Sequence, residues 1–134
     1  MKKYENFVSN LRTLEKADRQ DLENDFVVSG IIDKFSLQFE LGWKVMKELL
    51  LYEGRTIANT GSPRSIIKAA YSMWDFLDED VWMEMLAARN NVTHVYDENA
   101  ARELVEDILT RYIPEFQKME KNFDQLYPRL LGHV

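Results

Sequence analysis

The sequence has no cysteine and no long apolar run, and both absences exclude classes of protein. Without cysteine, the chain cannot hold a disulfide framework, bind zinc through thiolates or use a thiol as a nucleophile. Charged residues interrupt every hydrophobic region, so no stretch approaches the roughly 18 apolar residues that a membrane span needs. The first residues lead into a polar amphipathic segment without the apolar core of a signal peptide. We therefore expect a soluble, cytoplasmic protein with no membrane partner.

Positive charge is also scarce. The chain carries 17 lysines and arginines against 23 aspartates and glutamates, which gives a formal net charge of −6 at pH 7. An acidic surface suits solubility, and it repels nucleic acids in general. A glycine-rich phosphate-binding loop is absent as well.

What the sequence does contain is helical periodicity, with apolar residues three or four positions apart. With 134 residues, 46% of them apolar, the chain can bury the core of one domain that spans residues 1–134. The pattern predicts an all-α, up-and-down bundle of about five helices, two of them long. Capping residues and polar breaks define five predicted helices. The first runs from Lys3 to Arg19, and the second follows an Asn24 or Asp25 cap and ends at Glu53. The third runs through Trp74 after a Ser62 cap, the fourth through Arg89 after an Asp78 cap, and the fifth through Leu126 after an Asp97 cap.

The second helix is expected to lie at the centre of the bundle because it carries two apolar stripes. One stripe contains Val28, Ile32, Phe35, Phe39, Met46 and Leu49, and the other contains Leu37, Leu41 and Val45. Gly42 lies on the first stripe, where its missing side chain would let a neighbouring helix approach closely. Gly54 is a good stop for this helix, and a loop is expected over residues 55–61. Pro114 is expected to kink the fifth helix.

Only two histidines are present, and His94 has more informative neighbours than the penultimate residue, His133. Arg89 continues the apolar stripe of the fourth helix, so its side chain is expected to point toward packed surface. On an unbroken helix Arg89 and His94 would lie about 140° apart, and a bend at the weak helix formers between them could bring them together. A guanidinium holds phosphoryl oxygens and an imidazole exchanges a proton near neutral pH, which suits phosphate chemistry. The alternative is a helix-end cluster in which Arg89 pairs with an acid and His94 with a carbonyl.

Three passages of the sequence form a recognisable set. They are residues 35–44 (FSLQFELGWK), residues 62–70 (SPRSIIKAA), and the run from Arg89-Asn90 through His94 to Tyr96-Asp97-Glu98. The set resembles the HEPN superfamily, specifically its branch of nucleotidyltransferase substrate-binding or HepT-like proteins. The last passage fits that family's pattern of arginine, four residues, histidine, any residue and tyrosine. The resemblance extends from Asp25 to about Leu126.

The resemblance implies a helical homodimer with paired motifs near the subunit interface, encoded beside a small minimal nucleotidyltransferase. In the toxin–antitoxin form of this pair, the HEPN protein is a metal-independent RNA endonuclease, and its partner silences it by transferring AMP to the motif tyrosine. Arg89 would then stabilise the scissile phosphate, and His94 would transfer the proton. Asn90 would orient them, and Tyr96 would accept AMP. The chain itself would need no cofactor, because ATP and Mg²⁺ would belong to the partner.

Two function classes stay open. The first is a ribonuclease toxin held in check by modification, and the second is a non-catalytic subunit that presents a substrate, or itself, to the nucleotidyltransferase. A purely structural dimer is a third. With a net charge of −6, RNA cleavage would need a local basic patch made by Arg55, Arg64, Lys68 and Arg89.

Several other residue groups have simpler interpretations. Glu40 and Lys44 are four positions apart, so an ordinary ion pair on the helix surface is expected. The tryptophans are expected to anchor the core or a dimer interface rather than to stack on bases; they are Trp43, Trp74 and Trp82. A run of acids resembles a metal cluster but is better explained by helix capping; it contains Asp75, Asp78, Glu79 and Asp80.

Overall fold

The computed structural model describes residues 1–92 and 97–132. These residues contain helices and no β-strand, which confirms the predicted all-α class. The elements are α1 (Lys2–Leu14), η1 (Ala17–Arg19), α2 (Asp25–Tyr52), η2 (Thr56–Asn59), α3 (Pro63–Met73), α4 (Glu79–Asn90), α5 (Glu98–Asp107), η4 (Ile108–Tyr112) and α6 (Ile113–Leu126).

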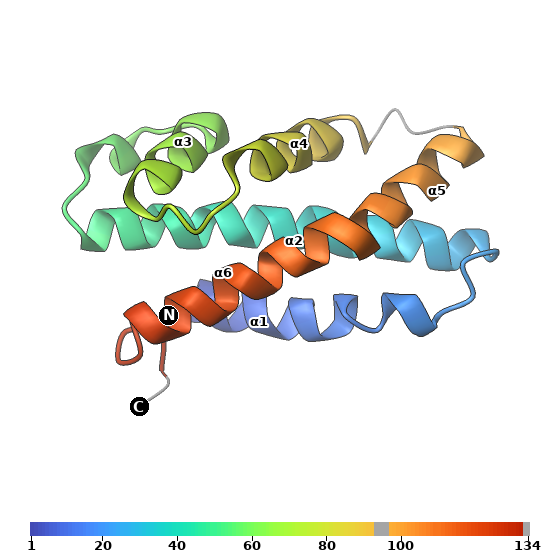
Figure 1. Cartoon of the computed structure of the whole chain (residues 1–134), viewed down its shortest axis with the longest axis horizontal. Helices are drawn as coiled ribbons and strands as arrows, with labels where there is room; N and C mark the ends of the chain where they lie inside the picture. Colours follow the sequence, from blue (N-terminus) through green and yellow to red (C-terminus); the bar gives the residue numbers. More distant parts are fainter. Residues whose placement is uncertain (93–96, 133–134) are drawn as a thin grey trace.

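Helix α2 lies at the centre of the bundle (Figure 1) and packs against α1, α3, α4 and α5. The chain runs out along α1 and returns along α2. Helices α3 and α4 together make the next outward pass, and α5 to α6 return diagonally across α2. This alternation is the up-and-down order that the sequence predicted.

The ends of α2 follow from its capping residues. The Asn24 side-chain oxygen accepts hydrogen bonds from the backbone N–H groups of Phe26 and Val27, at 2.9 and 3.3 Å. These bonds satisfy two donors that have no partner within the helix. At the other end, Gly54 adopts a φ of +78°, a left-handed conformation that favours glycine and stops the helix.

Two predicted boundaries are wrong in detail. The first helix ends at Leu14 rather than Arg19, because the polar run that follows offers only Ala17 to the core, where it is buried in the short turn η1. The segment expected to be a loop, residues 55–61, contains the single 3₁₀ turn η2.

The predicted fifth helix is one continuous helical run divided into α5, η4 and α6. Pro114 lies in the first turn of α6, and the five residues before that helix are π-helical. Proline lacks an N–H donor and clashes with the preceding turn, so a wider π-type turn ahead of it accommodates the missing bond. The irregularity that the sequence predicted at Pro114 therefore takes the form of a π-helical segment.

The two apolar stripes of α2 differ in how far they are buried. All six residues of the first stripe are buried, as predicted. In the second stripe only Val45 is buried; Leu37 is 46% exposed and Leu41 is half-buried. The two stripes predicted two buried faces, and within this chain the second face is only partly buried, since neighbouring helices leave Leu37 uncovered.

A close contact between α2 and α4 fixes their spacing. A Cβ atom added at Gly42 would come within 2.8 Å of Trp82 Cη2. Trp82 is fully buried, and its indole N–H donates to the buried Glu115 carboxylate at 3.1 Å. The same carboxylate oxygen accepts from the backbone N–H of Asp78 at 2.9 Å. Glycine at position 42 thus lets the Trp82 ring rest directly on the α2 backbone, as the sequence predicted.

Candidate active site

Arg89 lies in the last turn of α4, at the edge of the bundle. The helix is capped by Asp78, whose Oδ1 accepts a hydrogen bond from the backbone N–H of Val81 at 3.2 Å. Trp82 precedes Arg89 by seven residues, which is about two turns, so both side chains point toward α2. The buried tryptophan therefore sets where the arginine meets α2.

The guanidinium of Arg89 is held on several sides. Its Nη1 donates to Glu40 Oε1 in an ion pair, and its Nε donates to Asn90 Oδ1 at 3.2 Å. Its carbon Cζ lies 5.3 Å from the centre of the Phe39 ring, within the range of a cation–π contact. The side chain of Arg89 is 25% exposed and that of Glu40 is 28% exposed, so the pair lies at the boundary between core and solvent.

Glu40 has partners on both carboxylate oxygens. While Oε1 accepts from Arg89, Oε2 accepts from the indole Nε1 of Trp43 at 3.0 Å and lies 3.6 Å from Lys44 Nζ. The predicted ion pair between Glu40 and Lys44 is therefore confirmed. Counting Glu40 as −1 and the two cations as +1 each, the group keeps a net charge of +1.

The link between Glu40 and Arg89 was not predicted from the sequence. The two residues are 49 positions apart, and spacing along a helix can only reveal neighbours three or four residues away. The available signal was that Glu40 lies inside residues 35–44, one of the three passages that resemble the HEPN superfamily. This contact matches the alternative interpretation given for Arg89, in which the arginine pairs with an acid.

Two of the predicted site residues, His94 and Tyr96, lie outside the described residues. The structure therefore brings Arg89 and Asn90 together and leaves the positions of the histidine and the tyrosine as predictions. The predicted cap that follows them is confirmed, since Asp97 Oδ1 accepts from the backbone N–H of Asn99 at 2.9 Å. His133 also lies outside the described part of the chain.

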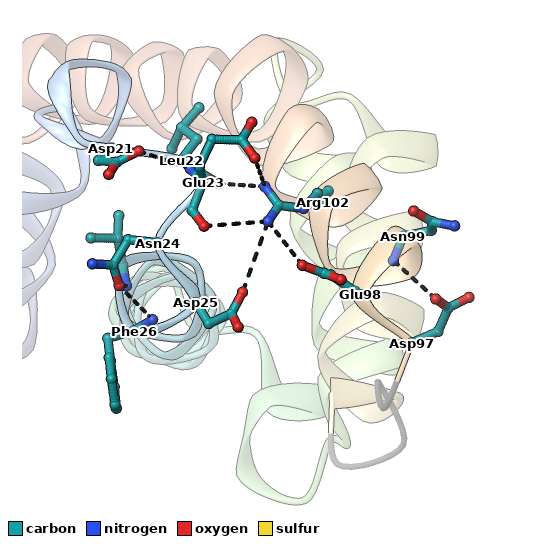
Figure 2. A network of polar contacts seen from close by, with 11 residues as sticks. Asp21, Leu22, Glu23, Asn24, Asp25, Phe26, Asp97, Glu98, Asn99 and Arg102 are labelled. Atoms are coloured by element: carbon teal, nitrogen blue, oxygen red, sulfur yellow. Dashed lines mark hydrogen bonds and ion pairs between the residues drawn. The ribbon is translucent and has the colours of Figure 1, made fainter.

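Arg102 ties the start of α5 to the start of α2 (Figure 2). Its Nη1 donates to the backbone carbonyl of Leu22 at 2.6 Å, and its Nη2 donates to Glu98 Oε1 at 3.1 Å. The carboxylates of Glu23 and Asp25 lie 3.6 and 3.8 Å from the same guanidinium. Because α5 begins just after Tyr96 in the sequence, this network anchors the chain on the C-terminal side of the motif.

The other charged residues singled out in the sequence do not pair with Arg89. Arg55, Arg64 and Lys68 are exposed on the segment from the end of α2 to α3, whereas the cation beside Arg89 is Lys44. The acidic run borders a cavity of about 450 Å³ together with Lys118, and Asp78 acts as the predicted helix cap. Within residues 1–92 and 97–132, no three acidic or histidine side chains gather in a way that could hold a metal ion.

The tryptophans divide into two kinds. Trp82 and Trp74 are buried, which confirms their prediction as core residues. Trp43 is half-buried, and its indole N–H is the donor that holds Glu40.

The chemistry that this arrangement favours is the binding of a phosphate. A guanidinium has five N–H donors, and Glu40 and Asn90 take one each. Three donors therefore have no hydrogen-bond partner among the described residues. A planar guanidinium with spare donors can bind two oxygens of a phosphate at once.

A family model described as "Nucleotidyltransferase substrate binding protein like" matches residues 1–125. The match includes the first helix, which lies outside the range of the resemblance seen in the sequence. No curated protein matches the chain. Along the part of the chain that the structure describes, no helix has the length and hydrophobicity needed to span a bilayer.

Proposed function

Since the family model covers residues 1–125, the chain belongs to the nucleotidyltransferase substrate-binding-like family, and we propose that it is a HepT-like ribonuclease controlled by a nucleotidyltransferase partner. In this proposal Arg89 binds the scissile phosphate of RNA, His94 transfers a proton, and Asn90 orients the arginine. The observation that carries the proposal is the guanidinium of Arg89. It is held by Glu40 and Asn90, it is partly exposed, and it lies five residues before His94.

The proposed reaction needs no metal ion. The ribose 2′-hydroxyl attacks the adjacent phosphorus while the bond to the 5′-oxygen breaks, which leaves a 2′,3′-cyclic phosphate and a 5′-hydroxyl. One group accepts the 2′ proton and another supplies a proton to the departing 5′-oxygen. The guanidinium of Arg89 stabilises the negative charge that builds up on the phosphoryl oxygens in the transition state.

Assembly into a two-fold dimer would supply both proton-transfer groups. Each chain has one credible histidine, His94, and two-fold symmetry places two copies of every residue near the axis. One copy could then act as the general base and the other as the general acid.

An uncovered apolar face of α2 supports this dimer. Phe26 is 90% exposed and Leu37 is 46% exposed. They are eleven positions apart, which is close to three helical turns, and Leu41 follows one turn later on the same face. Glu40 borders this face, so a second copy seated on it would lie beside Arg89. We expect each protomer to bury on the order of 800 Å² or more.

Sedimentation equilibrium tests the dimer directly. We expect a dimer at micromolar concentration, and we expect Leu37→Glu to give a monomer because it places a charge in the apolar interface. The matched control is Leu126→Glu, since Leu126 is 54% exposed on a different helix, α6. A parent chain that sediments only as a monomer would contradict the proposed assembly.

The partner is proposed from the family description and from the motif tyrosine. A nucleotidyltransferase that supplies ATP and Mg²⁺ would transfer AMP to the hydroxyl of Tyr96, with pyrophosphate as the leaving group. Intact-mass spectrometry after co-incubation would show the added nucleotide on the parent chain and none on Tyr96→Phe. Addition of equal extent to both chains would place the acceptor elsewhere.

A non-catalytic role is the second candidate. The family description itself speaks of substrate binding, and the acid paired with Arg89 could hold the arginine as a structural link between α2 and α4. In that case the chain would present a substrate, or itself, to the nucleotidyltransferase and would not cut RNA.

Cleavage of total cellular RNA separates the two candidates. We expect the parent chain, freed of AMP, to cleave in the presence of EDTA, and we expect His94→Ala to lose roughly 10²–10⁴-fold in rate. Arg89→Lys should also cleave RNA slowly, because a lysine cannot form the planar, bidentate hydrogen bonds that a guanidinium makes to a phosphate. Circular dichroism and melting curves must show that both variants remain folded. If the parent chain leaves RNA intact, the binding role replaces the ribonuclease.

A further inference from the structure

The carboxylate of Glu40 is fixed at both of its oxygens. Oε1 accepts from Arg89, and Oε2 accepts from the Trp43 indole at 3.0 Å and lies 3.6 Å from Lys44. A carboxylate with partners on both oxygens cannot rotate without breaking at least one contact. A residue of α2 therefore fixes the position of the Arg89 guanidinium, although α2 lies outside the sequence motif around Arg89.

Three contacts define the plane in which the Arg89 guanidinium lies. Glu40 holds Nη1, Asn90 holds Nε, and the ring of Phe39 faces Cζ at 5.3 Å. Phe39 is fully buried, so this ring provides a rigid support. An arginine otherwise has several rotatable bonds and samples many rotamers, which it would have to give up on binding a phosphate.

We propose that Glu40 is a positioning residue, which aims the remaining N–H donors of Arg89 at the scissile phosphate of RNA. This inference rests on the proposed ribonuclease function. Because the guanidinium is already oriented before substrate binds, less rotamer freedom is lost when the transition state forms. Glu40 itself touches neither substrate nor product in this proposal.

The opposing effect is electrostatic. A carboxylate beside Arg89 also weakens the attraction of that arginine for a phosphate. Lys44 compensates for this, because it lies 3.6 Å from the same carboxylate and leaves the group of three charges at +1. The two effects predict opposite results when the charge of Glu40 is removed: loss of orientation slows the reaction, whereas loss of a counter-ion strengthens RNA binding.

Steady-state cleavage of an RNA oligonucleotide by Glu40 variants separates these effects. We expect Glu40→Gln to lower kcat by about 10–100-fold and to change KM by less than about 3-fold. Glu40→Asp keeps the charge and should retain more activity than Glu40→Gln. The matched control is Glu48→Gln, because Glu48 lies two turns further along α2 and pairs with Lys3 at 3.2 Å. We expect this control to cleave like the parent chain.

A double variant tests whether Glu40 acts through Arg89. Lysine has no planar guanidinium for Glu40 to orient. In the Arg89→Lys background, Glu40→Gln should therefore lower kcat by less than about a further 3-fold. A purely structural role would give losses that multiply, and it would lower the melting temperature of Glu40→Gln below that of Glu48→Gln.

The outcomes are distinct. Suppose that the parent chain cleaves RNA and that Glu40→Gln has an equal or higher kcat. Glu40 is then only a counter-ion and this inference is wrong, whereas the proposed ribonuclease function is unaffected. The positioning role is equally excluded if only KM changes, or if Glu40→Asp is no better than Glu40→Gln. If the parent chain does not cleave, the proposed function fails and this inference fails with it.

Discussion

Replacing Gly42 by alanine tests the contact that sets α4 against α2. Two effects oppose each other in this substitution. Alanine is favoured over glycine in a helix interior by about 1 kcal/mol. The added Cβ, however, would come within 2.8 Å of the Trp82 ring and 3.4 Å of the Phe7 ring. Trp82 cannot move aside cheaply, because it is fully buried and hydrogen-bonded to Glu115.

Gly30 provides the matched control on the same helix. A Cβ added there meets nothing within 4 Å, so Gly30→Ala should stabilise the protein by about 1 kcal/mol. Overpacking of a core costs about 1–3 kcal/mol, so Gly42→Ala should change the free energy of unfolding by about 0–2 kcal/mol in the destabilising direction. The two variants should therefore differ by about 1–3 kcal/mol.

Chemical denaturation of both variants in urea measures this difference. Thermal melts give a second reading, with about 4 °C in Tm for each kcal/mol in a domain of this size. If Gly42→Ala stabilises the protein as much as Gly30→Ala does, the Trp82 ring does not rest on the α2 backbone. In that case α4 would no longer be held where Arg89 meets Glu40, and the candidate active site would lose its structural basis.

Three further predictions concern other parts of the molecule. Glu115→Ala should destabilise the protein by about 2–4 kcal/mol in urea denaturation, because it leaves the buried indole N–H of Trp82 and the partly buried backbone N–H of Asp78 without their acceptor. Burial, and secondly the hydrogen bond to Asp124, raises the pKa of Tyr4 well above that of a free tyrosine. The unfolded chain then releases this proton above about pH 10 while the folded chain keeps it, so the free energy of unfolding should fall as pH rises past 10, and less steeply in Tyr4→Phe. Arg102→Ala should speed amide hydrogen exchange over residues 98–102, since it removes the network at the start of α5.

Each of these predictions has a control or a contradicting result. Glu115→Gln retains an acceptor and should cost less than Glu115→Ala; equal costs would mean that the hydrogen bonds matter little. A Tyr4→Phe variant with the same alkaline slope as the parent would show that Tyr4 does not hold its proton in the folded state. Arg111→Ala removes a different ion pair, to Glu84 at 2.5 Å, and should leave exchange at residues 98–102 unchanged.

Features that depend on neighbours along the chain could be predicted from the sequence. The Asn24, Ser62, Asp78 and Asp97 caps all accept backbone hydrogen bonds as expected, because capping is a local interaction. The buried stripe of α2 followed from its helical period. The close approach at Gly42 was also predicted, since a glycine within an apolar stripe leaves room for a neighbour.

Features that depend on residues far apart in the chain could not be predicted in the same way. The contact of Glu40 with Arg89 requires α4 to dock on α2 at one particular height, which the Gly42–Trp82 contact sets. The exposure of Leu37 shows a similar limit, because periodicity identifies an apolar face without saying whether this chain or another covers it. The fit of Arg89, His94 and Tyr96 to the family pattern pointed to a site but not to the residue that would hold its arginine.

The end groups of RNA fragments produced by the purified chain test the central claim most directly. The chain, freed of AMP, is incubated with a defined RNA oligonucleotide in EDTA, beside a His94→Ala variant purified in the same way, and the fragments are analysed by mass spectrometry. We predict fragments with a 2′,3′-cyclic phosphate and a 5′-hydroxyl, made by the parent chain and reduced at least about 100-fold with the variant. Intact RNA after incubation with the folded parent chain, or equal cleavage by parent and variant, would contradict the proposed ribonuclease mechanism.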